Sequence, residues 1–117
     1  MRERPRDKAR LEHIINACDI VADAIKKYGF EHMLQDPILY YGLVKHVEII
    51  GEAIYMLSKD FKKQHNEVAW QEIEDLRHIL VHDYYKINPN LLRPIVEEDI
   101  PKLQPIIKKL YEKESSL

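Results

Sequence analysis

The stretch LEHIINACDIVADAIKKY, residues 11–28, decides the fold class of this chain. Its apolar side chains recur three and four residues apart: Leu11, Ile14, Ile15, Cys18, Val21, Ala22, Ile25 and Tyr28. This spacing places them on one face of an α-helix. Gly29 follows at once and is a stop signal for a helix. The stretch therefore predicts an amphipathic helix that needs partners to cover its apolar face.

A second helix is expected from Pro37 to about Lys59. Asp36 is a favoured N-cap, and Pro37 has a φ angle already suited to the first helical position. The segment Phe30–Gln35 is short enough to join two antiparallel neighbours. Apolar side chains of the second helix follow two adjacent lines, with Leu39, Leu43, Ile50, Ala53 and Leu57 on one and Tyr40, Val44, Val47 and Ile54 on the other. So wide a stripe suggests two partners, such as the bundle core and a subunit interface.

A third helix is expected after the polar stretch Asp60–Glu67, with Asn66 as a candidate cap. It should begin near Trp70 and end between His82 and Tyr85. No β-alternation or internal repeat competes with the helical pattern.

Asn88 and Pro89 open the last segment, in which apolar residues again recur at helical spacing. These are Val96, Ile100, Leu103, Ile107 and Leu110. Three prolines, Pro94, Pro101 and Pro105, should kink or break this helix. Four helices with short connections predict an all-α fold, an antiparallel four-helix bundle formed as one domain by residues 1–117.

Composition narrows the functional classes. The 117 residues include one cysteine, Cys18, whose apolar context predicts a buried, reduced thiol in a reducing compartment. No stretch approaches the roughly 18 apolar residues of a membrane span, and the N-terminus lacks the apolar part of a signal peptide, so we expect a cytoplasmic protein.

The net charge is only −2, so any nucleic-acid binding needs a local patch of positive charge. One such patch of positive charge lies at the N-terminus and consists of Arg2, Arg4, Arg6, Lys8 and Arg10. A solvent-exposed start of a helix accounts for these residues equally well.

Reactive side chains are concentrated in RHILVHDY, from Arg77 to Tyr84. His78 and His82 are four residues apart, a spacing that can hold a metal, but no third ligand accompanies them in the sequence. In an unbroken helix Arg77 and His82 would diverge by about 140° and lie about 7.5 Å apart along the axis. They converge only if the helix loosens near His82. Alternatively, they line opposite walls of one cleft or meet across a dimer axis.

From Leu43 onward the sequence resembles the HepT-type toxins of the HEPN superfamily. The family motif is Arg, four residues, His, one residue, Tyr, which is matched here by Arg77, His82 and Tyr84. The surroundings agree: EIIGEA at residues 48–53, VAW at 68–70 and EEDIPKL at 97–103. His78 stands where the family commonly has Asn, and Arg93 and Pro94 replace an expected aromatic residue and a helix former.

The resemblance implies a HEPN-like bundle that works as a homodimeric, metal-independent endoribonuclease with no cofactor. It also implies a partner, a minimal nucleotidyltransferase (MntA-like) antitoxin that adds AMP to the motif tyrosine, here Tyr84. Arg77 and His82 would then be catalytic, with His78 and Asp83 in supporting positions.

The residue types suit RNA cleavage independently of the family. RNA carries its own nucleophile, the 2'-OH, so cleavage needs a base, an acid for the leaving 5'-oxygen and a cation for the phosphorane. His82 can be base or acid near neutral pH, and Arg77 can hold two phosphate oxygens. In a twofold dimer the second His82 could take the complementary role.

Each of these side chains could also have a purely structural role. His82 could cap a helix end, Arg77 could pair with Glu74 on the surface, and Tyr85 is expected to be a packing aromatic. Two alternative functions follow: a non-catalytic module that binds a nucleotide or docks the nucleotidyltransferase, and a purely structural dimerisation bundle.

Overall fold

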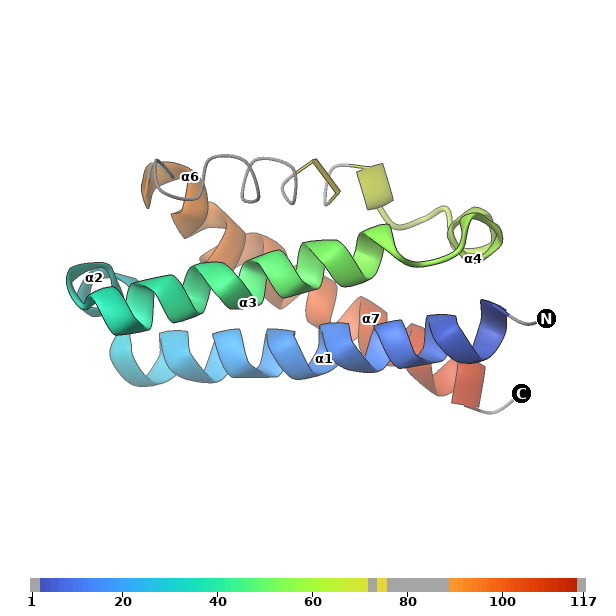
Figure 1. Ribbon diagram of the computed structural model, residues 1–117, viewed down its shortest axis with the longest axis horizontal. Helices are drawn as coiled ribbons and strands as arrows, with labels where there is room; N and C mark the ends of the chain where they lie inside the picture. The colour runs from blue at the N-terminus through green and yellow to red at the C-terminus, as the bar shows by residue number, and fades with distance from the viewer. Residues whose placement is uncertain (1–2, 72–73, 76–88, 116–117) are drawn as a thin grey trace.

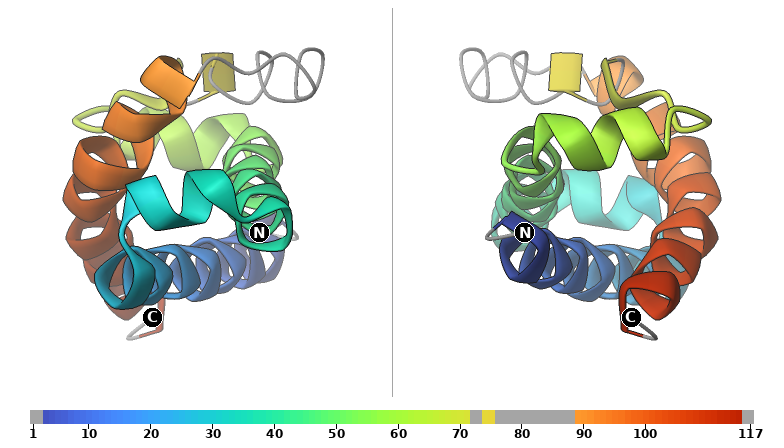
Figure 2. Two further views of the ribbon diagram at one scale, coloured as in Figure 1. Left: turned by 90° about the vertical axis from the view of Figure 1, so that its left-hand side faces the viewer. Right: turned by 90° about the vertical axis from the view of Figure 1, so that its right-hand side faces the viewer.

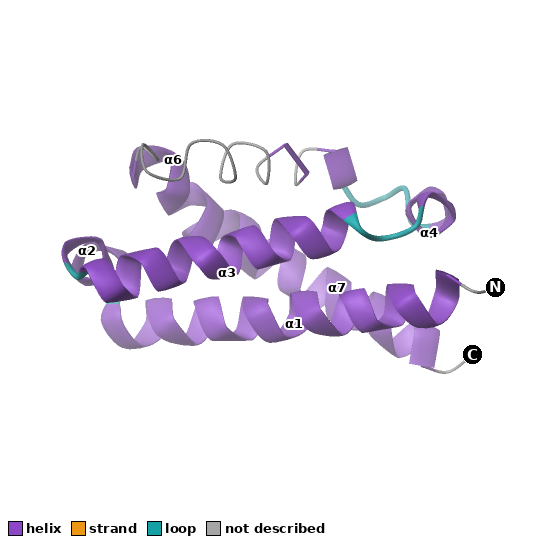
Figure 3. Cartoon of the chain, in the orientation of Figure 1, coloured by secondary structure: helices purple, strands orange, loops and turns teal. Residues whose placement is uncertain are grey.

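The computed structural model describes residues 3–71, 74–75 and 89–115. Two helices, α1 (Glu3–Tyr28) and α3 (Pro37–Tyr55), lie side by side along the length of the molecule (Figure 1). A third, α7 (Ile100–Ser115), packs against α1 on another side. The described part of the chain is helical with short loops and contains no strand (Figure 3), as the sequence predicted.

Residues at two predicted helix boundaries, the end of the first helix and the start of the second, behave as expected. Gly29 has a φ of 78°, a conformation that favours glycine, and lies between α1 and the next helix. The Asp36 carboxylate accepts hydrogen bonds from the backbone N–H groups of Ile38 at 3.0 Å and Leu39 at 3.3 Å. Asp36 therefore caps α3, and the predicted start of the second helix is confirmed.

Both connections that the sequence suggested, the short segment Phe30–Gln35 and the polar stretch Asp60–Glu67, contain short helices. The segment Phe30–Gln35 is a short helix, α2, that buries Phe30 and Met33. Helix α3 ends at Tyr55, earlier than the expected Lys59, and α4 (Lys59–Gln64) follows with Ser58 as its cap. Figure 2 shows α2 crossing one end of the bundle and α4 crossing the other. Burial of one phenylalanine in each connection explains why it is helical. Phe30 in α2 and Phe61 in α4 are both buried in the core and hold these short helices against the bundle.

The core uses both apolar lines of α3, so the assignment of one line to a subunit interface was wrong. Seven of these side chains are buried within this chain: Leu43, Val44, Val47, Ile50, Ala53, Ile54 and Leu57. Leu39 and Tyr40 are partly buried against the same cluster. They pack with residues of α1 and α7 such as Ile14 and Ile107. A different set on α3 is exposed, including Ile38 at 84% and Tyr41 at 56%.

The last segment is helical from Pro89 to Ser115, so the prolines do not break it, but its helical geometry changes after Pro94. It consists of α6 (Pro89–Pro94), the π-helical stretch η2 (Ile95–Asp99) and α7. Pro94 lies where the backbone changes to wider π-helical turns, so this proline has a structural effect. Pro101 is the second residue of α7, directly after η2, and does not end the helix. Pro105 lies inside α7 without ending it.

None of the described helices is both long and apolar enough to cross a membrane.

Candidate functional site

The residues to which the sequence assigns chemistry lie outside the described residues. These are Arg77, His78, His82, Asp83 and Tyr84, all within the segment 76–88. The structure therefore defines the surroundings of the predicted site, namely the residues immediately before it and immediately after it.

Trp70 anchors the chain before the motif. Its indole Nε1–H donates a hydrogen bond to the backbone carbonyl of His65 at 2.9 Å. The ring is buried and lies 6.2 Å from the ring of Phe61 in α4. The hydrogen bond satisfies the polar atom of the indole, and burial covers its apolar surface. Together these two contacts hold the Trp70 side chain in place. Trp70 belongs to VAW (residues 68–70), one of the stretches that resemble the family. Through Trp70, this stretch connects α4 to the segment that carries the motif.

Glu74, three residues before the motif arginine, forms an ion pair with Lys62 of α4. Both side chains are largely buried, with exposed fractions of 19% and 18%. Glu74, the surface partner that the sequence offered for Arg77, is thus paired with Lys62, and Arg77 itself lies outside the described residues.

Arg93 anchors the chain after the motif. Its guanidinium donates hydrogen bonds to Glu31 of α2 at 2.6 Å and to Glu97 of η2 at 2.7 Å. It also lies over the ring of Phe30, 5.5 Å from the centroid. The hydrogen bond and charge of Glu97, with a smaller contribution from Glu31, raise the pKa of Arg93 above its ordinary value. A cation on an aromatic face thus occupies the place where the family pattern suggested an aromatic residue.

These two anchors hold the chain at opposite ends of α3. Lys62 and Phe61 belong to α4, which follows α3, and Glu31 and Phe30 belong to α2, which precedes it. Figure 1 shows α4 and α6 at the two ends of the bundle. On both sides of the predicted catalytic segment, the chain is therefore joined to a short helix at one end of α3.

A cavity of about 740 Å³ lies at the α4 anchor. It is bounded by the end of α3, by α4 and by residues of the segment 70–74 that precedes the motif in the sequence. Its lining includes Lys59, Lys62, Trp70 and Glu74. This mixture of lysines, carboxylate and aromatic surface offers both charged and stacking contacts next to the motif.

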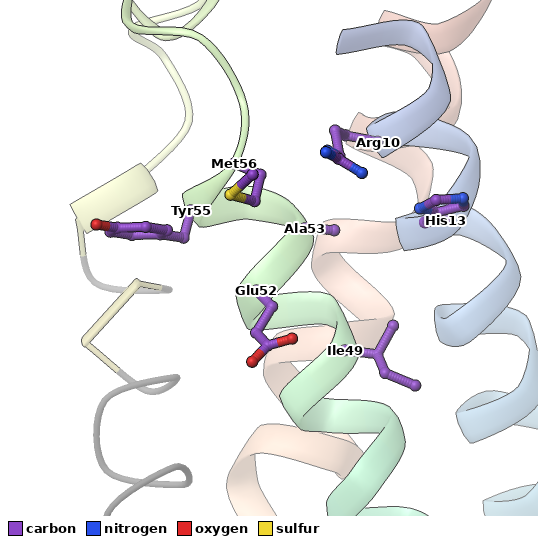
Figure 4. A pocket seen from close by; sticks show the side chains of 7 residues that line it. All are labelled: Arg10, His13, Ile49, Glu52, Ala53, Tyr55 and Met56. Carbon is purple, nitrogen blue, oxygen red and sulfur yellow. The ribbon is translucent and has the colours of Figure 1, made fainter. Parts of the chain in front are cut away.

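A second cavity, of about 420 Å³, lies between α1 and α3 (Figure 4). Its lining comprises Arg10, His13, Ile49, Glu52, Ala53, Tyr55 and Met56. Sequence reasoning missed it, since Arg10 was grouped with the charged N-terminus and His13 was given no role. The spacing of Arg10 and His13, three residues apart on one face of a helix, was a signal for the α1 wall alone.

The family-like stretch EIIGEA lies in α3 and is mostly part of the core. Ile50, Gly51 and Ala53 are buried, whereas Glu52 is exposed and lines the second cavity. In EEDIPKL, Ile100 and Leu103 are buried. These stretches therefore support the bundle, and Ile49, Glu52 and Ala53 also line the second cavity.

A metal site has no support among the described residues, which contain no group of three His, Cys, Asp or Glu side chains able to hold an ion. The His78–His82 pair lies outside the described residues.

Comparisons with known proteins agree on one family. The model of the family described as "Ribonuclease HepT-like" matches residues 14–110. A protein named "Putative RNase" from Caldanaerobacter subterraneus subsp. tengcongensis is 36% identical over 104 residues, which cover 89% of this chain and 93% of the relative. "Probable ribonuclease HepT" from Thermococcus cleftensis is 34% identical over 103 residues, covering 88% and 94%. No solved structure is a significant match.

Proposed function

Since the chain belongs to the HepT-like ribonuclease family and is an endoribonuclease, we propose that it is the toxin of a type VII-like toxin–antitoxin pair. The observation that carries this proposal is the extent of the family match, residues 14–110, which includes Arg77, His82 and Tyr84 at the family spacing. Its substrate is RNA.

Cleavage proceeds by attack of the substrate's 2'-oxygen on the adjacent phosphorus. His82 takes the 2'-OH proton, the new O–P bond forms, and the bond from phosphorus to the 5'-oxygen breaks. The leaving 5'-oxygen takes a proton from a histidine, and the products are a 2',3'-cyclic phosphate and a 5'-OH. Arg77 neutralises the charge that develops on the phosphorane. His78 and Asp83 support these two residues. No metal is required in this scheme.

The enzyme acts as a homodimer, in which His82 of the second subunit supplies the complementary proton transfer. Exposed apolar surface on the first half of α3 supports this: Ile38 is 84% exposed and Tyr41 56%. Exposed apolar side chains of this size are suited to a protein contact.

The partner is a minimal nucleotidyltransferase, MntA-like, that attaches AMP to Tyr84 and thereby silences the enzyme. A phosphodiester anion and an adenosine at Tyr84 would occupy the space of the RNA phosphate and compete for Arg77.

Expression from a tightly controlled promoter, with and without the neighbouring nucleotidyltransferase gene, tests the proposal. Growth should stop with degradation of cellular RNA, and the neighbouring gene should restore growth. Growth arrest with intact RNA would instead favour the non-catalytic binding or docking module. Normal growth and intact RNA without the neighbouring gene would contradict the toxin assignment.

A further inference from the structure

We propose that the cavity between α1 and α3 binds a nucleotide, with Arg10 and His13 taking its phosphate. The described lining of this cavity comes from α1, from α3 and from Met56 directly after α3. The proposal rests on the chemistry of the cavity lining and does not require that the chain cleave RNA.

Arg10 supplies the phosphate-binding end. Its Nε atom is shielded from solvent and has no hydrogen-bond partner within the described part of the chain. Figure 4 shows the guanidinium extending from α1 toward α3, into the space between the helices. A shielded N–H without an acceptor costs free energy, and this group stays charged at all physiological pH values. A phosphate oxygen in the cavity can accept from the N–H groups at the end of this guanidinium, which extends into that space, through a charge-assisted hydrogen bond.

His13 lies one helical turn after Arg10, lines the same cavity and is exposed. Residues three apart on a helix are neighbours on its surface. One phosphate can therefore contact both side chains, the guanidinium through its fork of donors and the imidazole through a ring nitrogen.

The α3 side of the cavity matches the other two parts of a nucleotide. Ile49, Ala53 and Met56 present an apolar wall, and Met56 is 55% exposed and flexible enough to fit a flat base. The carboxylate of Glu52 can accept hydrogen bonds from ribose hydroxyls, the contact that acidic residues make in dinucleotide sites.

Charge and size are compatible with such a ligand. In Figure 4 Ala53 lies between the Arg10 guanidinium and the Glu52 carboxylate, so one molecule can meet the cation and the carboxylate at different ends. The volume of about 420 Å³ falls within the range of small-molecule sites. Inorganic phosphate would contact neither the apolar wall nor the Glu52 carboxylate, whereas the base and ribose of a nucleotide can contact both. A nucleotide therefore fits the cavity better than inorganic phosphate.

Titration calorimetry of the full chain with 5'-AMP, 3'-AMP, adenosine and inorganic phosphate tests the proposal. Both nucleotides should bind more tightly than adenosine or phosphate. Arg10→Gln should weaken nucleotide binding by about tenfold or more, as expected for the loss of a charge-assisted hydrogen bond. Arg6→Gln is the matched control, because Arg6 is exposed on the same helix and does not line the cavity. A preference for 3'-AMP would identify a 3'-phosphorylated RNA end as the source, and a preference for 5'-AMP a free nucleotide or a 5'-phosphorylated RNA end.

A spectroscopic measurement locates the ligand. The imidazole C–H signals of His13, assigned through His13→Gln, should shift on addition of AMP, and circular dichroism should show unchanged helix content in Arg10→Gln. Equal AMP affinity in the wild type and Arg10→Gln would overturn the proposal, as would the absence of AMP binding or binding that leaves the His13 signals in place.

Discussion

Asp7 of α1 accepts two hydrogen bonds from Ser58, one from the backbone N–H at 2.8 Å and one from the hydroxyl at 2.7 Å. Ser58 is also the cap of α4, where its hydroxyl oxygen accepts from Phe61 N at 3.1 Å. Asp7 is 4% exposed, so both bonds are shielded from water. The start of α1 and the start of α4 are thus joined by a single side chain, and α4 in turn holds Trp70 and Glu74.

The first prediction is that Asp7 stabilises the bundle. Asp7→Ala should lower the free energy of unfolding by about 3 kcal/mol, because two hydrogen bonds to a charged group are lost and Ser58 N–H is left without its acceptor. Ser58→Ala should cost about 1–2 kcal/mol through loss of the cap. Urea denaturation measures both. Asp23→Ala, at an exposed position of α1, is the control and should change stability by no more than about 0.5 kcal/mol. An effect of Asp7→Ala no larger than the control would contradict the structural role.

The second prediction concerns pH. Burial, with a smaller contribution from the charge of Asp19, raises the pKa of the Cys18 thiol from 9.0 to about 12. Because the folded-state pKa is raised, burying the neutral thiol contributes fully to the free energy of unfolding below about pH 9. This contribution is lost as the pH rises toward 12, where the unfolded chain gains stability by ionising its thiol. In native protein near pH 9 the thiol should react slowly with a disulfide reagent, and rapidly once urea unfolds the chain. Cys18→Ala should show a smaller loss of stability over the same pH range. A native thiol that reacts as fast as an unfolded one would refute the buried state.

Much of this architecture could be predicted from the sequence because it follows from periodicity and caps. The helical spacing from Leu11 to Tyr28 predicted α1, and Asp36 with Pro37 predicted where α3 begins. Helix α4 was missed because its six residues carry one buried side chain, Phe61, which is too little for a periodic pattern. The partner of its cap, Asp7, is 51 residues away from Ser58 in sequence, and no local rule pairs them.

The site was less accessible to sequence reasoning. The motif identified Arg77, His82 and Tyr84 by their spacing, yet these residues lie outside the described part of the structure. The anchors around them depend on pairs such as Lys62 with Glu74 and Arg93 with Glu31, which meet only after the helices pack. For the same reason the cavity beside Arg10 could not be predicted, since its two walls come from α1 and α3.

The third prediction is that Arg77 and His82 are catalytic. Arg77→Ala and His82→Ala should each lower RNA cleavage by at least about 100-fold, since they remove phosphorane stabilisation and proton transfer respectively. Helix content and oligomeric state should not change. Arg6→Ala and His32→Ala are matched controls at exposed positions and should retain activity. Full activity of either motif variant would exclude this mechanism.

The fourth prediction concerns metal ions and products. Because the nucleophile is the 2'-OH of the substrate and Arg77 supplies the positive charge, a chelator should not reduce the cleavage rate. Products should end in a 2',3'-cyclic phosphate, which mass spectrometry of a short RNA substrate can identify. Cleavage that requires Mg²⁺ or leaves a 5'-phosphate would indicate metal-assisted hydrolysis.

The fifth prediction is that Tyr84 is the site of control. Incubation with the neighbouring nucleotidyltransferase, ATP and Mg²⁺ should attach AMP to Tyr84: the phenolic oxygen attacks the α-phosphorus and pyrophosphate leaves. The modified enzyme should lose RNA cleavage because the added group carries a negative charge that competes for Arg77 and a bulk that blocks the phosphate. Intact-mass spectrometry and peptide mapping measure the modification.

Tyr84→Phe separates control from catalysis, because it removes the phenolic oxygen and keeps the aromatic ring. This variant should still cleave RNA and stop growth, yet escape silencing by the nucleotidyltransferase. Tyr85→Phe is the matched control at the next position and should be modified and silenced like the wild type. AMP found on Tyr85, or silencing of Tyr84→Phe with ATP present and not without it, would assign the switch to another residue. Silencing of Tyr84→Phe without ATP would instead mean that the partner restrains the enzyme by binding alone.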